Sequence, residues 1–199
     1  CYFIGGGDWF DAIVVTDPRY NKAVDGMERT EIIDEQVDGL YDIMLPYKDR
    51  IFGVGTGNHE TVIGKRGSNP AKRIAKQLDV ICLGYSWLFK LILSETGKQR
   101  TRTIVIRGHH GWGGGSRTQG ADLTKFSRDI TYWNDANIFL YGHVHRRQSD
   151  LIESFGLSGD TLIPKPKLMG ICGTYLKTFT LTDDSTYSEE KGYPPAKIG

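Results

Sequence analysis

The stretch Arg50–Glu60, RIFGVGTGNHE, shows the pattern on which the rest of the sequence is built. A short apolar run breaks into a glycine-rich loop, and that loop carries an Asn, a His and a Glu. Three further glycine clusters, GGGD, RGHHGWGGG and YGHVH, follow the apolar runs CYFI, TIVI and ANIFL in the same way. Buried strands that break into such loops are typical of α/β proteins, which present functional residues at the carboxyl ends of their strands. An α/β fold is therefore predicted.

Three segments predict helices between these strands. Residues 30–45 repeat apolar side chains at helical spacing, with acids toward the N-terminal end. Residues 69–78 place Pro70 near the first position of a second helix, and residues 123–136 predict a third. After YGHVH the pattern changes to short alternating strands and a turn-rich tail. Because no repeat or linker interrupts this order, residues 1–199 are interpreted as a single domain.

Composition narrows the class of protein. The net charge of +1 gives no global basic field of the kind that nucleic-acid-binding proteins carry. Three cysteines lie far apart without a CxxC pair, which favours free thiols in a reducing compartment. The longest apolar run, residues 80–93, is too short and too mixed to span a bilayer. We expect a cytoplasmic protein without a membrane partner.

All five histidines of the chain fall in the glycine-rich loops. If the backbone after the fourth apolar run is extended, His143 and His145 project to the same side, about 6.5–7 Å apart. Two metal ions about 3.5–4 Å apart could then take one imidazole each. His109 and His110 are adjacent and would point in opposite directions, so only one of them is expected to reach the same site.

Two other loops add oxygen ligands. An amide oxygen such as that of Asn58 suits a borderline or hard divalent ion, and the neighbouring His59 suits proton donation or phosphate contact. Asp8 follows three glycines, which allow the backbone to approach a metal or phosphate closely. Asp11 is expected to fix Asp8 or a neighbouring loop through hydrogen bonds rather than to bind metal.

Four segments of the chain resemble, in their order, the motifs of the calcineurin-like metallophosphoesterase family. They are Gly7-Asp8-x-x-Asp11, the GNHE segment ending at Glu60, Gly108-His109 and the GHVH segment ending at His145. The C-terminal segment STYSEEKGYPP is similar to phage and bacterial members. The resemblance implies a four-layer αββα sandwich of mixed sheets flanked by helices, with a dinuclear metal centre at the strand ends. It also implies phosphate-ester hydrolysis by a metal-activated water.

The family pattern assigns roles residue by residue. Asp8 would bridge both ions, and His145 would bind one of them. His59 would contact the phosphate and stabilise or protonate the leaving oxygen. The other ion would be bound by Asp8 together with Asn58, His109 and His143. Glu60 would support these ligands without binding metal.

One family motif, D-x-H, does not occur in the chain. In the family it precedes the G-D block and supplies two ligands to the ion that His145 binds. Only one metal shell is therefore expected to be complete within these 199 residues. We interpret the sequence as a fragment that lacks the first strand and the extreme C-terminus. The mixed Asp, Asn and His ligands suit two divalent ions of Mn, Fe or Zn.

The expected substrate is a phosphodiester such as a nucleotide or nucleic acid, and Arg117 and Arg146 are candidate contacts to its phosphates. The alternative interpretation is that these two arginines lie on an ordinary solvated surface without a binding role. A second hypothesis is a non-catalytic scaffold of the same fold that binds a protein partner, which would be expected to lose an active-site His. A structural zinc module is a third, but it requires cysteine pairs that the chain lacks.

Overall fold

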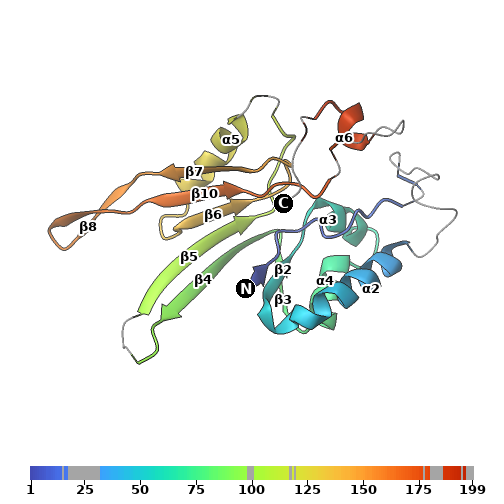
Figure 1. The fold of residues 1–199 in the computed structure, drawn as a ribbon, viewed down its shortest axis with the longest axis horizontal. Coiled ribbons are helices and arrows are strands. Elements are labelled where there is room, and N and C mark those ends of the chain that lie inside the picture. The colour runs from blue at the N-terminus through green and yellow to red at the C-terminus, as the bar shows by residue number, and fades with distance from the viewer. Residues whose placement is uncertain are drawn as a thin grey trace. The chain divides into compact units, whose positions relative to one another are not determined.

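The structure is a computed structural model. It describes residues 1–14, 16–17, 32–97, 101–116, 118, 120–176, 178–179, 186–193 and 195. The chain divides into two compact units, unit 1 (Cys1–Ser86) and unit 2 (Trp87–Gly199), which are described separately. Helices and strands occur in both (Figure 1), so the predicted α/β class is confirmed. The single-domain interpretation of residues 1–199 stays a prediction. Within the described residues, no helix has the length and apolar character needed to cross a membrane.

Unit 1 is built on a three-stranded parallel sheet of order β1-β2-β3. The strands are β1 (Phe3–Ile4), β2 (Ile51–Gly55) and β3 (Ile81–Gly84). The helical elements are α2 (Ile32–Met44), the 3-10 helix η1 (Leu45–Arg50), α3 (Asn58–Gly64) and α4 (Pro70–Gln77). Because the strands are parallel, the loops that follow β1 and β2 leave the same edge of the sheet.

Helix α4 packs against α2, β2 and β3. It begins at Pro70 because Asn69 caps it: the Asn69 side-chain oxygen accepts the Lys72 N–H at 3.2 Å. Its apolar side faces the core of unit 1, where Ile74 contributes a fully buried side chain beside Val37 of α2 and Val54 of β2. Burial of such side chains is worth about 1.5–3 kcal/mol each, and it holds the sheet edge in place.

Unit 2 contains a five-stranded mixed sheet of order β4-β5-β6-β10-β7. Its strands are β4 (Ser86–Ser94), β5 (Thr101–His109), β6 (Ile138–Tyr141), β7 (Gln148–Ile152) and β10 (Lys167–Ile171). Strands β5, β6 and β10 run parallel, and β7 is antiparallel to β10. Helix α5 (Ala121–Ile130) packs against β7 and β10, and its fully buried Phe126 stacks on Tyr141 of β6 with ring centroids 4.4 Å apart.

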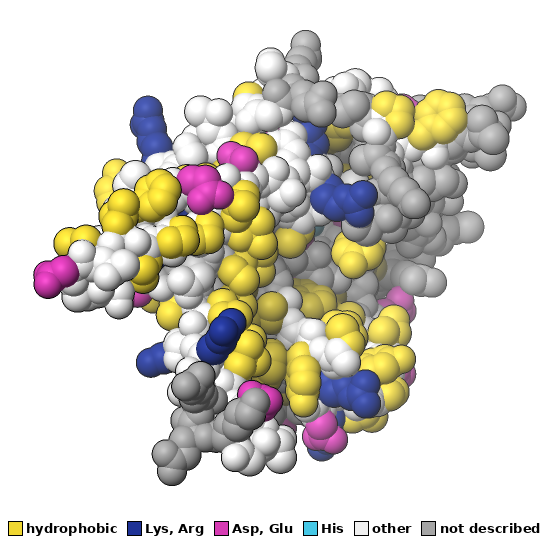
Figure 2. All heavy atoms as spheres, turned by 60° about the vertical axis from the view of Figure 1, so that its left-hand side comes forward, with side chains coloured by type: hydrophobic (Ala, Val, Ile, Leu, Met, Phe, Trp, Pro, Cys, Tyr) yellow, Lys and Arg dark blue, Asp and Glu magenta, His cyan; other side chains and the backbone are white. Residues whose placement is uncertain are grey.

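Two small elements complete unit 2. The hairpin of β8 (Phe155–Ser158) and β9 (Thr161–Pro164) exposes the apolar side chains of Phe155, Leu157 and Leu162. Apolar side chains at the surface are seen in the space-filling view of Figure 2. Helix α6 (Tyr187–Glu190) is closed by a reciprocal cap: Thr186 Oγ1 accepts the Glu189 N–H, and Glu189 Oε2 accepts the Thr186 N–H at 2.8 Å.

The structure confirms the predicted elements and adds others. Helices form at 32–44, 70–77 and 121–130, although the third ends at Ile130 rather than continuing to residue 136. Each of the four predicted strands is present, and β5 extends to His109. The apolar run at 80–93 contains β3 and β4, and the GNHE loop is the first turn of α3. The turn-rich tail contains the short helix α6.

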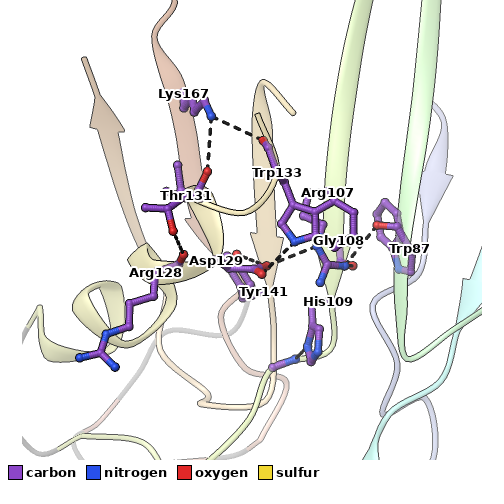
Figure 3. A network of polar contacts seen from close by, with 12 residues as sticks. Trp87, Arg107, Gly108, His109, Arg128, Asp129, Thr131, Trp133, Tyr141 and Lys167 are labelled. Carbon is purple, nitrogen blue, oxygen red and sulfur yellow. Dashed lines mark hydrogen bonds and ion pairs between the residues drawn. The ribbon is translucent and has the colours of Figure 1, made fainter. Parts of the chain in front are cut away.

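A buried polar cluster supports the sheet of unit 2 (Figure 3). Asp129 lies at its centre, 13% exposed, and accepts hydrogen bonds from Tyr141 Oη at 2.8 Å and Trp133 Nε1 at 2.9 Å. Arg107, which is 5% exposed, lies with its Nε 3.3 Å from the same carboxylate and stacks over the Trp133 ring. The guanidinium also donates to the Gly108 carbonyl at 2.6 Å. One carboxylate therefore balances a buried cation and two further donors.

We expect Asp129→Asn to lower the free energy of unfolding by about 3 kcal/mol or more, because it leaves the buried Arg107 cation without its counter-charge. Urea unfolding followed by fluorescence would measure this loss. Asp135→Asn is the matched control, since Asp135 is exposed and its change should cost less than about 0.5 kcal/mol. Equal losses for the two variants would contradict the assigned role of the cluster.

Candidate functional site

The loop of unit 1 that carries Asp8 is held by the carboxylate of Glu60, which is fully buried. Glu60 Oε1 accepts the Trp9 N–H at 2.6 Å and the Phe10 N–H at 3.3 Å. Its Oε2 accepts the Asp8 N–H at 3.1 Å and the Gly57 N–H at 2.7 Å. A buried carboxylate whose two oxygens accept four backbone donors has its hydrogen-bonding capacity satisfied. Glu60 therefore ties the two motif loops of unit 1 together, in line with its expected supporting role.

Glycine is required where these two loops meet. A Cβ atom on Gly7 would lie 2.4 Å from the Gly57 nitrogen, closer than any real side chain approaches backbone. Gly7 also has a φ of 97°, and Asp8 itself adopts a left-handed φ of 54°. Such a conformation is uncommon for a residue other than glycine and is maintained only when the surroundings fix it. Here the contacts of Glu60 and Gly57 do so.

Asp8 and His59 lie side by side within unit 1. The His59 N–H donates to Asp8 Oδ1 at 3.2 Å, so the first turn of α3 orients the carboxylate. The His59 ring nitrogen Nδ1 lies 2.6 Å from the Asp11 carbonyl oxygen, which only accepts, so Nδ1 carries a proton. Nε2 is thereby left as the ring nitrogen that exchanges its proton. Asp11 supports His59 through its main-chain carbonyl.

Tyr85, directly after β3, was not recognised in the sequence. Burial raises the pKa of its hydroxyl, and the negative charges of Asp8 and Glu60 raise it further. The phenol therefore stays protonated at neutral pH. A tyrosine that follows an apolar run and a glycine gives no motif signal of its own, which is why sequence reasoning missed it.

In unit 2, His110 and His143 form a pair at the carboxyl ends of the parallel strands β5 and β6. Their rings lie 5.2 Å apart, centroid to centroid, and their ligand nitrogens are within 4.8 Å of each other. The Gly142 N–H donates to the His110 carbonyl at 2.9 Å, and a Cβ on Gly111 would lie 2.5 Å from the Gly142 oxygen. The two loops therefore touch through glycine backbone, which brings the imidazoles close enough to share one metal ion.

His109 points into a different environment, contrary to the expectation that it is the metal ligand. Its Nδ1 accepts the Gly111 N–H at 2.8 Å, and its ring packs edge-on against Trp112 with centroids 4.9 Å apart. Burial lowers the pKa of His109, and the nearby Arg107 cation lowers it further. A neutral imidazole whose Nδ1 is already occupied fits a structural role. The geometry thus favours His110, which is 2% exposed, over His109.

The expectation of an extended GHVH segment is wrong. Strand β6 ends at Tyr141, and both His143 (φ 71°) and His145 (φ 56°) are left-handed. The turn is closed by the Val144 N–H, which donates to the Gly142 carbonyl at 2.9 Å. The i, i+2 argument for a shared face therefore does not apply, because it requires an extended backbone.

His145 instead contacts Thr174, another residue that the sequence did not reveal. His145 Nδ1 lies 3.0 Å from Thr174 Oγ1, and this hydroxyl also accepts the Leu176 N–H at 2.9 Å. Thr174 is 3% exposed and lies just after β10, whose parallel pairing with β6 brings its loop to the same edge. With two oxygen lone pairs and one proton, Thr174 can fix the orientation of the imidazole.

The two predicted substrate arginines have different outcomes. Arg146 lies directly after the histidine turn, and its Nη1 donates to the Thr118 carbonyl at 3.3 Å. Arg117 lies outside the described residues.

Comparison of the chain with protein-family models, with curated protein sequences and with solved structures found no match.

We expect Glu60→Gln to destabilise unit 1 by about 3 kcal/mol, because the amide cannot accept four N–H donors and loses the charge that strengthens these bonds. Hydrogen exchange would show it most locally, as faster exchange of the Asp8, Trp9 and Phe10 amides. Glu35→Gln, on the exposed face of α2, is the control. Unchanged exchange at these three amides would contradict the clamp.

Proposed function

We propose that the protein is a divalent-metal-dependent phosphoesterase of the calcineurin-like type. Its proposed substrate is a phosphodiester, a nucleotide or nucleic acid, and the attacking group is a metal-activated water. The four-layer αββα sandwich expected from the family resemblance belongs to the same proposal. The observation that carries it is the clustering of ligand-type residues at strand ends within each unit. Asp8 and Asn58 follow the parallel strands β1 and β2, and His110 and His143 follow the parallel strands β5 and β6.

The donor set fits borderline divalent metals. Asp8, His110 and His143 are the residues that we assign as ligands first, since each offers a carboxylate oxygen or an imidazole nitrogen for binding. Asn58 and His145 are the further candidates. When bound, ions of Mn, Fe or Zn would supply an activated water and neutralise the charge of the phosphoryl oxygens. His109, one of the expected ligands, is replaced by His110 in this proposal.

His59 is the proposed proton donor to the leaving oxygen. Its Nδ1 proton is directed at the Asp11 carbonyl, and its main-chain N–H is directed at Asp8. The ring is therefore fixed in position, with Nε2 free to carry the second proton of the imidazolium. A positioned acid of this kind contributes about 10²–10⁴-fold to a rate. Asp8 would be oriented both by His59 and by the backbone that Glu60 holds.

The test of the function is hydrolysis of the dinucleotide thymidylyl-(3′→5′)-thymidine in the presence of Mn²⁺, because its alkoxide leaving group requires a proton donor. We expect turnover that EDTA abolishes, and we expect His59→Ala to lower kcat by about 10²–10⁴-fold while Mn²⁺ stoichiometry is kept. Mn²⁺-dependent turnover no higher than that of His59→Ala would overturn the proposal. Metal binding without turnover would instead favour the non-catalytic scaffold.

The assignment of His110 makes a separate prediction about metal affinity. By calorimetry with Mn²⁺, His110→Ala and His143→Ala should each weaken binding by about 100-fold or more, as loss of a ligand exceeds the effect of losing a supporting group. His109→Ala is the matched control and should change affinity by less than about tenfold. Circular dichroism would establish that each variant is folded. The opposite ranking of His109 and His110 would refute the assignment.

A further inference from the structure

Unit 2 contains a pocket of about 660 Å³ beside the histidine turn. This volume lies within the range of about 300–1,000 Å³ that is usual for small-molecule sites. The pocket walls come from four places: the loop between β5 and α5, the segment that contains His145, the loop after β10, and α6 with the turn that follows it. The lining includes His145, Arg146, Arg147, Gln148, Ser188, Lys191 and Tyr193.

The charge of the pocket is positive. Arg146, Arg147 and Lys191 line it, and none of its described lining residues is acidic. Guanidinium and ammonium groups bind phosphate through charge-assisted hydrogen bonds, and the guanidinium geometry allows two parallel bonds to one phosphate. In a protein of net charge +1, three cations around one hollow are a local concentration rather than a general property of the surface. The pocket therefore suits an anion.

Two polar atoms inside the pocket wall lack a partner among the described residues. Ser188 is 1% exposed and its Oγ makes no hydrogen bond there, and Gln148 Oε1 is likewise buried and unsatisfied. Such groups are rare in folded proteins because each costs about 1–3 kcal/mol. Ser188 can donate to a phosphate oxygen. Gln148 Oε1, in the amide orientation of the structure, needs a donor, which a phosphate dianion does not have.

Apolar and aromatic side chains form part of the remaining walls. Leu176, Pro195 and Tyr193 line the pocket, and the Tyr193 backbone N–H donates to the Ser188 carbonyl at 2.9 Å, which fixes the turn after α6. Tyrosine rings bind nucleobases by stacking, with about 1–3 kcal/mol per base. A ligand that satisfies all these features has a phosphate, a ring and a hydrogen-bond donor on its neutral part.

We propose that this pocket binds a nucleotide unit of the substrate: the phosphate to Arg146, Arg147, Lys191 and Ser188, the nucleoside to Gln148 and Tyr193. His145, a candidate metal ligand, also lines the pocket, so the bound nucleotide lies next to it. The inference rests on the proposed function for the reaction that the nucleotide would undergo. Binding itself requires no metal, and the two claims can therefore fail independently.

The experiment is calorimetric titration of the EDTA-treated protein with thymidine 5′-monophosphate, inorganic phosphate and a phosphoserine peptide. Thymidine monophosphate should bind at least about tenfold more tightly than either of the others, since only it offers phosphate, ring and donor together. Equal binding of inorganic phosphate would reduce the pocket to a simple anion site and overturn the proposal. Equal or tighter binding of the peptide, or no binding of the nucleotide, would also overturn it.

Variants locate the binding. Ser188→Ala and Lys191→Ala should each weaken nucleotide binding about tenfold. Ser188→Ala should not lower the free energy of unfolding, because it removes a buried hydroxyl that has no described protein partner. Arg128→Ala, on the exposed side of α5, is the matched charge control. Nucleotide binding that neither Ser188→Ala nor Lys191→Ala weakens would place the ligand elsewhere and refute the pocket. Nucleotide binding without any Mn²⁺-dependent hydrolysis would refute the phosphoesterase and leave the pocket standing.

Discussion

The geometry of the candidate site in unit 1 depends on one buried carboxylate. Glu60 accepts four backbone N–H groups from the loops that follow β1 and β2. Its bonds hold Asp8 in a left-handed conformation that is unfavourable in isolation. The ordered loop in turn lets the first turn of α3 reach Asp8 through the His59 N–H. Burial of the charge is tolerated because every donor is directed at it.

In unit 2, the positions of the ligand-type side chains are fixed mainly by contact between two glycine-containing loops. Two loops touch through the backbones of Gly111 and Gly142, and this close approach sets the separation of the His110 and His143 rings. Below them, Asp129 balances Arg107 and orders the end of β5. In both units, glycine provides close approach while a buried carboxylate fixes the strand ends. Ligand-type side chains are thereby preorganised before any ligand arrives, which is what metal or phosphate binding requires.

The sequence predicted the elements better than the directions of the side chains. Apolar periodicity and the Asn69-Pro70 start located α2, α4 and the four strands, because these signals are local. The choice between His109 and His110 stays a prediction, and the geometry favours His110, since the choice depends on where β5 ends relative to its pairing with β6. The extended GHVH prediction failed because contacts within the turn favour left-handed residues over continued pairing. Thr174 and the pocket could not be predicted, as both depend on β10 pairing beside β6 across a long separation in sequence.

The most direct test of the metal-dependent phosphoesterase is anomalous diffraction from crystals of the protein grown with Mn²⁺. We predict an anomalous peak bonded to the nitrogens of His110 and His143, with His109 still accepting the Gly111 N–H. A peak bonded to His109 in place of His110 would contradict the ligand assignment. The absence of any peak at Asp8, His110 and His143 at saturating Mn²⁺ would contradict the metal-dependent function itself.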